Sequence, residues 1–318
     1  MNPPCRLDRL AIPIYGTAKT LETIMRLVTF ESNGTARAGG LRTGSTGVLE
    51  VVDLQAHEPS LPGSIKEILE AGPSIWSTVE RAIAAEHCTP LAKLKLLAPV
   101  LNPQKIICVG LNYADHAAET GAKAGDEPVI FCKFPTTLRG PEAPIELPPE
   151  SNEVDYEAEL VAVIGARARR VSRVDALDHV AGFACGHDVS ARDWQKNKPG
   201  KQWLLGKSFD SFAPLGPWIA TRDEIADPGQ LDIEMKLNGQ VMQSSNTRQL
   251  IFPVDYLVSY VSHVCTLLPG DLIYTGTPSG VGVARTPPVF LKAGDVCEIS
   301  ITGLGTLRNP VKIATEYD

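Results

Sequence analysis

From residue 25 onward, short apolar runs alternate with clusters of Gly, Pro, Asn and Asp. Apolar runs of about four to eight residues with such borders are typical of strands. The pattern predicts strands at residues 25–30, 48–54, 106–110, 129–133, 154–165, 182–188, 231–238, 272–275 and 296–301. Helical spacing is found at residues 64–87, in two pieces divided at Gly72-Pro73, and at 190–197 and 253–266. Many strands with few helices between them predict an α+β, mainly β fold with an antiparallel or mixed sheet.

The same pattern divides the chain into three parts. Residues 1–24 are expected to be a loosely attached extension, because they fit neither a secretory signal nor an organelle transit peptide. Residues 25–100 are expected to form a small N-terminal αβ domain, with Ser64 as the N-cap of its first helix. Residues 101–318 are expected to form the larger, strand-rich domain.

The most informative run is Val154-Asp-Tyr-Glu-Ala-Glu-Leu-Val-Ala-Val-Ile-Gly165. Alternate side chains of a strand lie on one face, so Glu157 and Glu159 share a face with Val161 and Val163. Two acids at this spacing commonly belong to a half-solvated strand. Here both faces become apolar within the same run, so the carboxylates enter the interior, where like charges repel unless a cation neutralises them. The run therefore favours a hard divalent cation with oxygen ligands.

A third carboxylate is expected from the neighbouring strand at residues 182–188. Asp188 ends that strand, directly before Ser190-Ala-Arg-Asp193, whose spacing is that of a capping box at a helix start. The alternative role of Asp188 is as part of that cap. Three carboxylates favour octahedral Mg²⁺ or Mn²⁺, with Ca²⁺ as the third candidate because it usually collects more ligands.

Composition and charge narrow the class of protein. Of 318 residues, 43% are hydrophobic, and the net charge is −7. No apolar run reaches the roughly 20 residues of a membrane span, and the basic residues form no extended stripe, so we expect neither a membrane nor a nucleic-acid partner. Seven widely spaced cysteines without a C-x-x-C pair favour a reducing compartment. The expected location is the cytoplasm or, in a eukaryotic cell, the mitochondrion.

Five motifs resemble, in order, those of the fumarylacetoacetate hydrolase family, across roughly residues 105–313. They are Val109-Gly-Leu-Asn-Tyr-Ala-Asp-His116, Glu157-Ala-Glu159, Asp188-Val-Ser-Ala-Arg-Asp193, Gly206-Lys-Ser-Phe-Asp210 and Thr275-Gly-Thr-Pro278. The resemblance implies a mixed β-sandwich roll and usually a homodimer. It also implies Mg²⁺ or Mn²⁺ on Glu157, Glu159 and Asp188, in agreement with the strand pattern.

The resemblance gives His116 and Glu119 an expected catalytic role. They lie three residues apart on a short helix-like segment, so the carboxylate could orient the imidazole as a general base for water. A surface ion pair is the alternative. The small, polar segment at residues 121–126 is predicted to be a mobile lid that carries this pair over the metal.

Further roles implied by the resemblance concern the substrate, a small keto acid. Lys207 would place a positive charge near the reacting oxygens. Contacts to the substrate carboxylate are expected from Lys133, Arg192, Gln195 and Thr277. The alternatives are solvation for Lys133 and an ion pair with Asp193 for Arg192.

Three functions fit these residues. The first, which we favour from the sequence, is hydrolysis of a carbon–carbon bond in an acylpyruvate to give pyruvate and a carboxylic acid, with the metal as Lewis acid. The second uses the same site to decarboxylate or tautomerise oxaloacetate, or to isomerise a hydroxymuconate-type diacid. The third is a non-catalytic metal-binding scaffold, which would have no need of His116, Glu119 and Lys207.

Overall fold

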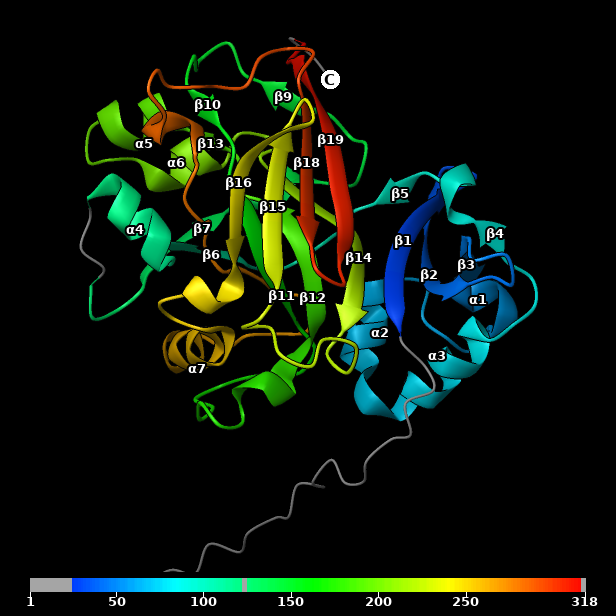
Figure 1. Ribbon diagram of the computed structural model, residues 1–318. Coiled ribbons are helices and arrows are strands. Elements are labelled where there is room, and N and C mark those ends of the chain that lie inside the picture. The colour runs from blue at the N-terminus through cyan, green and yellow to red at the C-terminus, as the bar shows by residue number, and fades with distance from the viewer. Residues whose placement is uncertain (1–24, 122–124, 316–318) are drawn as a thin grey trace, which may run out of the picture.

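The computed structural model of the protein describes residues 25–121 and 125–315, and the side chain of Thr120 is not described. The expected extension at residues 1–24 and the centre of the expected lid, residues 122–124, lie outside the described residues. Figure 1 shows a strand-rich body with helices at its periphery, which confirms the predicted α+β, mainly β fold. No helix within the described ranges combines the length and apolar character that crossing a bilayer requires.

Twelve strands of the described residues form one mixed sheet. Its main path runs through β4 (Thr89–Pro90), β3 (Leu49–Asp53), β2 (Thr35–Thr43), β1 (Arg26–Ser32), β14 (Ala213–Thr221), β12 (Val180–His187), β11 (Ala158–Ile164), β17 (Leu272–Tyr274), β6 (Ile106–Gly110) and β7 (Val129–Lys133). Off this path, β5 (Leu96–Leu97) pairs with β1 and β8 (Leu138–Arg139) with β14. Because β1 pairs with β14, the sheet continues from the N-terminal part of the chain into the larger part.

A second sheet of five strands packs across the middle of the first (Figure 1). It contains β16 (Gln240–Asn246), β15 (Asp232–Leu237), β18 (Val296–Ile301), β19 (Gly305–Ile313) and β9 (Ile145–Leu147). Ile233, Ile299 and Leu307 from this sheet share one apolar core with Leu160 and Phe183 from the large sheet. The two sheets with a core between them are the mixed β-sandwich roll expected from the sequence.

Helices α1 (Leu54–His57), α2 (Ile65–Ala71) and α3 (Trp76–Ile83) belong to a second core on the opposite face of the large sheet. The predicted N-cap is confirmed, since Ser64 and Glu67 form a reciprocal capping box. The predicted break is confirmed as well. Gly72 has a φ of +70°, which ends α2 and begins a short 3₁₀ turn before α3.

Strand β11 lies between the two cores. Leu160, Ala162 and Ile164 belong to the core beneath the five-stranded sheet, whereas Val161 and Val163 belong to the core beneath the helices. The predicted alternation is therefore confirmed, and every residue of β11 is buried. The prediction of one continuous strand over residues 154–165 is wrong. The chain forms β10 (Val154–Asp155), which pairs with β13 (Ser190–Ala191), and leaves the strand pattern at residues 156–157 before β11 begins.

The remaining helices are α4 (Ala114–Thr120), α5 (Arg192–Asn197), α6 (Trp203–Lys207) and α7 (Val254–Val264). The predicted capping box of α5 is wrong. Its N-cap is Ala191, and the Ser190 hydroxyl donates to the carbonyl of Asp188 at 2.9 Å. Ser190 is unavailable as a cap because it already belongs to β13, where it pairs with Asp155.

Candidate active site

Three buried carboxylates converge where β11 and β12 pair. Glu157 precedes β11, Glu159 lies within it and Asp188 follows β12. The strands are in register with Glu159 opposite Gly186, and the Asp188 amide donates to the Glu157 carbonyl at 3.0 Å. One carboxylate oxygen from each residue lies within 4.8 Å of the others. The predicted ligand set is thus brought together by strand pairing.

Two of the three carboxylates are already paired with cations. Lys207 Nζ lies 2.8 Å from Glu157 Oε2 and 2.7 Å from Asp188 Oδ2. Arg192 Nη2 lies 2.6 Å from Glu157 Oε1. Burial alone would raise the pKa of Glu157, but Lys207 and Arg192 outweigh burial and hold this pKa well below its usual range. Although burial opposes its charge, Asp188 and Glu157 raise the pKa of Lys207, so Lys207 is a fixed positive charge.

Glu159 has no such partner among the described residues. Its Oε2 accepts a hydrogen bond from the Gly276 amide at 2.8 Å, and no lysine or arginine within these ranges forms an ion pair with it. Burial, Asp188 and Glu157 all raise the pKa of Glu159 well above its usual range. Three oxygen donors, one of them a buried carboxylate short of positive charge, fit a hard divalent cation.

Arg192 is held by a residue that the sequence analysis missed. Asp155 accepts from Arg192 Nε at 2.8 Å and from the amides of Gly282 and Val283 at 2.7 and 3.1 Å. The alternative pairing of Arg192 with Asp193 is wrong, because the Asp193 carboxylate accepts from the Ser151 hydroxyl at 2.6 Å instead. The sequence held one weak indication of Asp155. It lies two residues before Glu157, so in a strand it would share a face with Glu157 and Glu159.

His116 and Glu119 form the predicted pair on helix α4. His116 Nδ1 lies 3.2 Å from Glu119 Oε2, and the Glu119 carboxylate accepts from the Gly280 amide at 2.9 and 3.1 Å. Helix α4 ends at Gly121, whose φ of +65° is left-handed. Because His116 is only 8% exposed, the alternative of a surface ion pair fits this position poorly.

Lys133 lies behind the carboxylates, away from the cavity. Its ammonium donates to the carbonyls of Val189, Lys207 and Phe212 at 2.6 to 3.0 Å and lies 2.6 Å from Asp188 Oδ1. The side chain is fully buried, so the alternative of solvation is wrong. Burial lowers the pKa of Lys133, and Asp188 partly offsets this effect. These contacts orient Asp188 and the backbone around Lys207. The predicted contact between Lys133 and the substrate stays a prediction.

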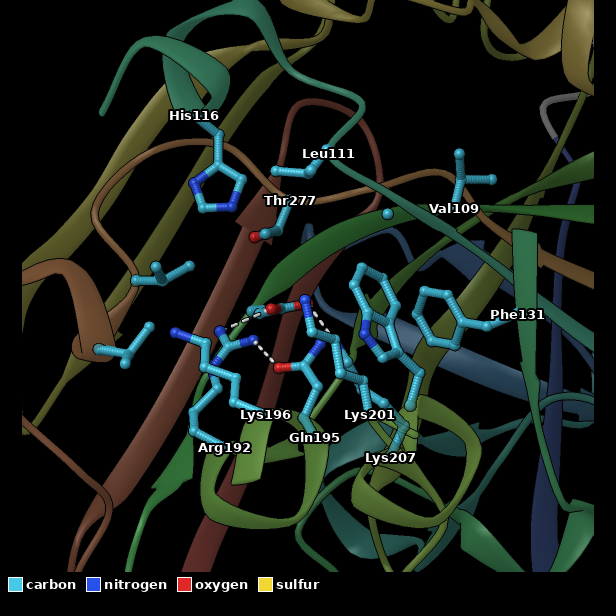
Figure 2. A pocket seen from close by; sticks show the side chains of 15 residues that line it. Val109, Leu111, His116, Phe131, Arg192, Gln195, Lys196, Lys201, Lys207 and Thr277 are labelled. Carbon is cyan, nitrogen blue, oxygen red and sulfur yellow. Dashed lines mark hydrogen bonds and ion pairs between the residues drawn. The ribbon is translucent and has the colours of Figure 1, made fainter. Parts of the chain in front are cut away.

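A cavity of about 440 Å³ opens beside the carboxylates. Its lining residues with polar side chains are Glu157, His116, Arg192, Gln195, Lys196, Lys201, Lys207 and Thr277, and its apolar walls are Val109, Leu111, Phe131, Trp203, Val281 and Val283. Figure 2 shows His116 and Thr277 on one side, with Arg192, Gln195 and the lysines on the other. The structure therefore places His116, Lys207, Arg192, Gln195 and Thr277 around one cavity, with Glu119 in contact with His116.

Comparison with known proteins now identifies the family. Residues 105–312 match the sequence model described as fumarylacetoacetate (FAA) hydrolase C-terminal. The chain belongs to the fumarylacetoacetate hydrolase family. Within this family it is 51% identical over 289 residues to the protein of Bos taurus named oxaloacetate tautomerase FAHD2A, mitochondrial, and the match covers 90% of this chain and 91% of that one.

Solved structures of the fumarylacetoacetate hydrolase family share the fold. A fumarylacetoacetate hydrolase from Exiguobacterium antarcticum has a TM-score of 0.80 at 37% identity, covering 91% of this chain and all of the other. A 5-carboxymethyl-2-hydroxymuconate delta-isomerase from Mycobacterium smegmatis has a TM-score of 0.72 at 37% identity, covering 92% of this chain and all of the other. The run Asp188 to Gln195, which resembles fumarylacetoacetate hydrolase domain-containing protein 2, agrees with the FAHD2A relative. That relative's name also agrees with the mitochondrial alternative for the location.

Proposed function

We propose that this chain is a divalent-metal-dependent tautomerase that interconverts the enol and keto forms of oxaloacetate in the mitochondrion. Hydrolysis of acylpyruvates, the function favoured from the sequence alone, becomes the second candidate. The observation that carries it is the group of three buried carboxylates at a cavity whose charged lining residues are mostly lysine and arginine, in a chain closely similar to a named oxaloacetate tautomerase.

Glu157, Glu159 and Asp188 would hold Mg²⁺ or Mn²⁺, with Ca²⁺ as a further candidate. When bound, such an ion supplies Lewis-acid chemistry, which favours the enolate form of a 2-oxo acid. Glu159 is the side chain that most needs the ion, because it has no cationic partner among the described residues. Lys207 already bridges the other two carboxylates and keeps them ionised.

The substrate would be bound by the cationic side of the cavity. Arg192 and Gln195 lie one helical turn apart on α5 and are linked by a hydrogen bond of 3.0 Å, so they present a fixed pair of donors to a carboxylate. Thr277 faces the cavity, and its hydroxyl accepts from Gln243 at 2.8 Å, so its own proton is left to donate to the substrate.

Tautomerisation moves one proton between the enol oxygen and carbon 3. His116 is the candidate proton carrier, because it faces the cavity and its other ring nitrogen contacts Glu119. Lys207 is a poor carrier, since two carboxylates hold its proton. No water nucleophile is needed for this reaction.

Hydrolysis is the second candidate because His116, Glu119 and Gly280 form a chain of contacts suited to activating water. Glu119 is fixed by the Gly280 amide and can therefore orient His116 and stabilise its protonated form. The solved relative named as a fumarylacetoacetate hydrolase supports keeping this reaction.

The deciding experiment compares two substrates on the purified full chain with Mg²⁺ or Mn²⁺. Decay of the enol absorbance of oxaloacetate measures tautomerisation, and pyruvate release from acetylpyruvate measures hydrolysis. We expect acceleration of enol decay that disappears with a chelator and returns with added metal. Enol decay that equals the uncatalysed rate with metal present would overturn the proposal, and pyruvate release would then select the hydrolase.

The homodimer that the resemblance implies is also proposed, to be tested by light scattering.

A further inference from the structure

Two lysines on the cavity wall have no role in the site described above. Lys196 lies on α5, four residues after Arg192 and one residue after Gln195. Residues separated by three or four positions share a helix face, and Arg192, Gln195 and Lys196 all line the cavity. Lys201 lies in the turn before α6 and lines the same cavity. Figure 2 shows both lysines on the side of Arg192 and Gln195.

The positive charges of Lys196 and Lys201 lack the carboxylate partners that Lys207 and Arg192 have. Lys207 and Arg192 each contact two carboxylates. By contrast, the side-chain ammonium groups of Lys196 and Lys201 form no hydrogen bond or ion pair with any described residue. The cavity thus has a layer of positive charge without counter-charge in a protein whose net charge is −7. Such a layer in a partly enclosed site attracts small anions.

The surroundings of Lys196 favour an added negative charge. Partial burial and the neighbouring Arg192 lower the pKa of Lys196, against the more weakly acting Asp155, Glu153 and Glu157. An anion beside Lys196 and Arg192 would relieve their mutual repulsion. None of these carboxylates forms an ion pair with Lys196 among the described residues, so a ligand anion can supply that contact.

The backbone holds Lys201 in an unusual conformation. Its φ of +53° lies in the left-handed region, directly after Gly200 at +74°. The turn is closed by the Lys201 amide, which donates to the Lys198 carbonyl at 3.1 Å, and by the Trp203 amide, which donates to the Lys201 carbonyl at 2.9 Å. This turn places Lys201 beside Trp203 on the cavity wall.

We propose that Lys196 and Lys201 bind a second carboxylate of the substrate, so that the cavity selects dicarboxylic over monocarboxylic 2-oxo acids. The inference rests on the proposed function and adds the residues that would select its class of substrate. The first carboxylate and the 2-oxo group belong at the inner end, near Arg192 and the three acidic residues. The cavity of about 440 Å³ has room for the second, since pockets of roughly 300–1,000 Å³ hold drug-sized ligands.

Lys198 provides a matched control in the same segment. Its ammonium lies 4.4 Å from the centre of the Trp194 ring, and it is not among the residues that line the cavity. The variants K196Q, K201Q and their combination remove the proposed contacts, whereas K198Q removes a lysine charge nearby.

The kinetic test compares enol oxaloacetate with enol phenylpyruvate, which has one carboxylate. For the K196Q/K201Q variant we expect KM for oxaloacetate to rise about tenfold or more, equivalent to about 1.4 kcal/mol. We expect KM for phenylpyruvate to change less than about twofold, and K198Q to resemble the parent protein on both acids. Equal changes for both acids, or no change for oxaloacetate, would overturn the inference.

A binding test separates this inference from the proposed function. Calorimetry with Mn²⁺ compares malate, which has two carboxylates, with lactate, which has one, and needs no turnover. We expect the parent protein to prefer malate and the double variant to lose that preference, with the single variants in between. A parent protein without the preference, or a double variant that keeps it, would refute the second carboxylate site even if tautomerisation is observed. Loss of tautomerisation with an intact preference would refute the proposed function alone.

Discussion

The Ser245 hydroxyl donates a hydrogen bond of 2.5 Å to Asp115 Oδ2, which joins strand β16 to helix α4. The other oxygen of Asp115 accepts from the His116 amide at 2.7 Å. The five-stranded sheet therefore holds the first turn of the helix that carries His116, while the Gly280 amide holds Glu119 one turn later. His116 is positioned from both sides of the helix.

Ser245→Ala should loosen this attachment. A hydrogen bond to a charged group contributes about 1.5–3 kcal/mol, so we expect kcat for hydrolysis of acetylpyruvate to fall about tenfold with little change in the dissociation constant for Mn²⁺. The exposed neighbour Ser244 is the control, and Ser244→Ala should leave kcat unchanged. A fall in Mn²⁺ affinity equal to the fall in kcat would show that Ser245 supports the whole site and not His116 alone.

Glu159→Gln should abolish binding of the divalent ion, because it removes the carboxylate that lacks a cationic partner among the described residues. We expect the dissociation constant for Mn²⁺, measured by calorimetry or electron paramagnetic resonance, to rise at least about 100-fold. Glu150→Gln, at an exposed position outside the site, is the control. Retention of tight binding by Glu159→Gln would rule out these three carboxylates as the ligand set.

His116→Ala should separate the two candidate reactions. Positioned general bases contribute about 10²–10⁴-fold, so we expect hydrolysis of acetylpyruvate to fall at least 100-fold. Enol decay of oxaloacetate should fall less, because solvent can deliver a proton to an enolate. Mn²⁺ affinity, measured in parallel, should be unchanged. Equal losses of both reactions would contradict this division of labour.

Lys133→Met should destabilise the fold. Removing one partner of a buried ion pair costs about 3–5 kcal/mol. Here it leaves Asp188 with Lys207 as its one remaining cationic partner among the described residues, and it removes a donor to three carbonyls. Urea unfolding with a chelator present should show this loss, while Lys93→Met at an exposed position should cost almost nothing. An unchanged free energy of unfolding would mean that Lys133 is not needed to balance Asp188.

The features predicted from the sequence were those that depend on local periodicity. The alternation in β11 predicted both cores, and with it the burial of Glu159. The three-residue spacing of His116 and Glu119 predicted their contact on α4. In each case the relevant residues lie within one element, so one strand or helix geometry fixes their relation.

The features that were missed depend on pairing between distant segments. Strand β14 was not predicted, because Pro214 and Pro217 lower the strand signal of its run. It is nevertheless fully buried and joins β1 to β12. Asp155 was passed over because its partners, Arg192 and the amides of Gly282 and Val283, are 37 to 128 residues away. Spacing along the chain carries no information about such partners.

The pairing of β1 with β14 bears on how the protein can be shortened. A fragment limited to the matched region, residues 105–312, would lack β1 and leave the amides and carbonyls of β14 without their neighbour near Ile219 and Ala220. It would also uncover apolar surface that Leu27 now covers. An open, apolar strand edge invites intermolecular association. The fragment of residues 105–312 is therefore an aggregation hazard, and expression should begin no later than the first residues of β1.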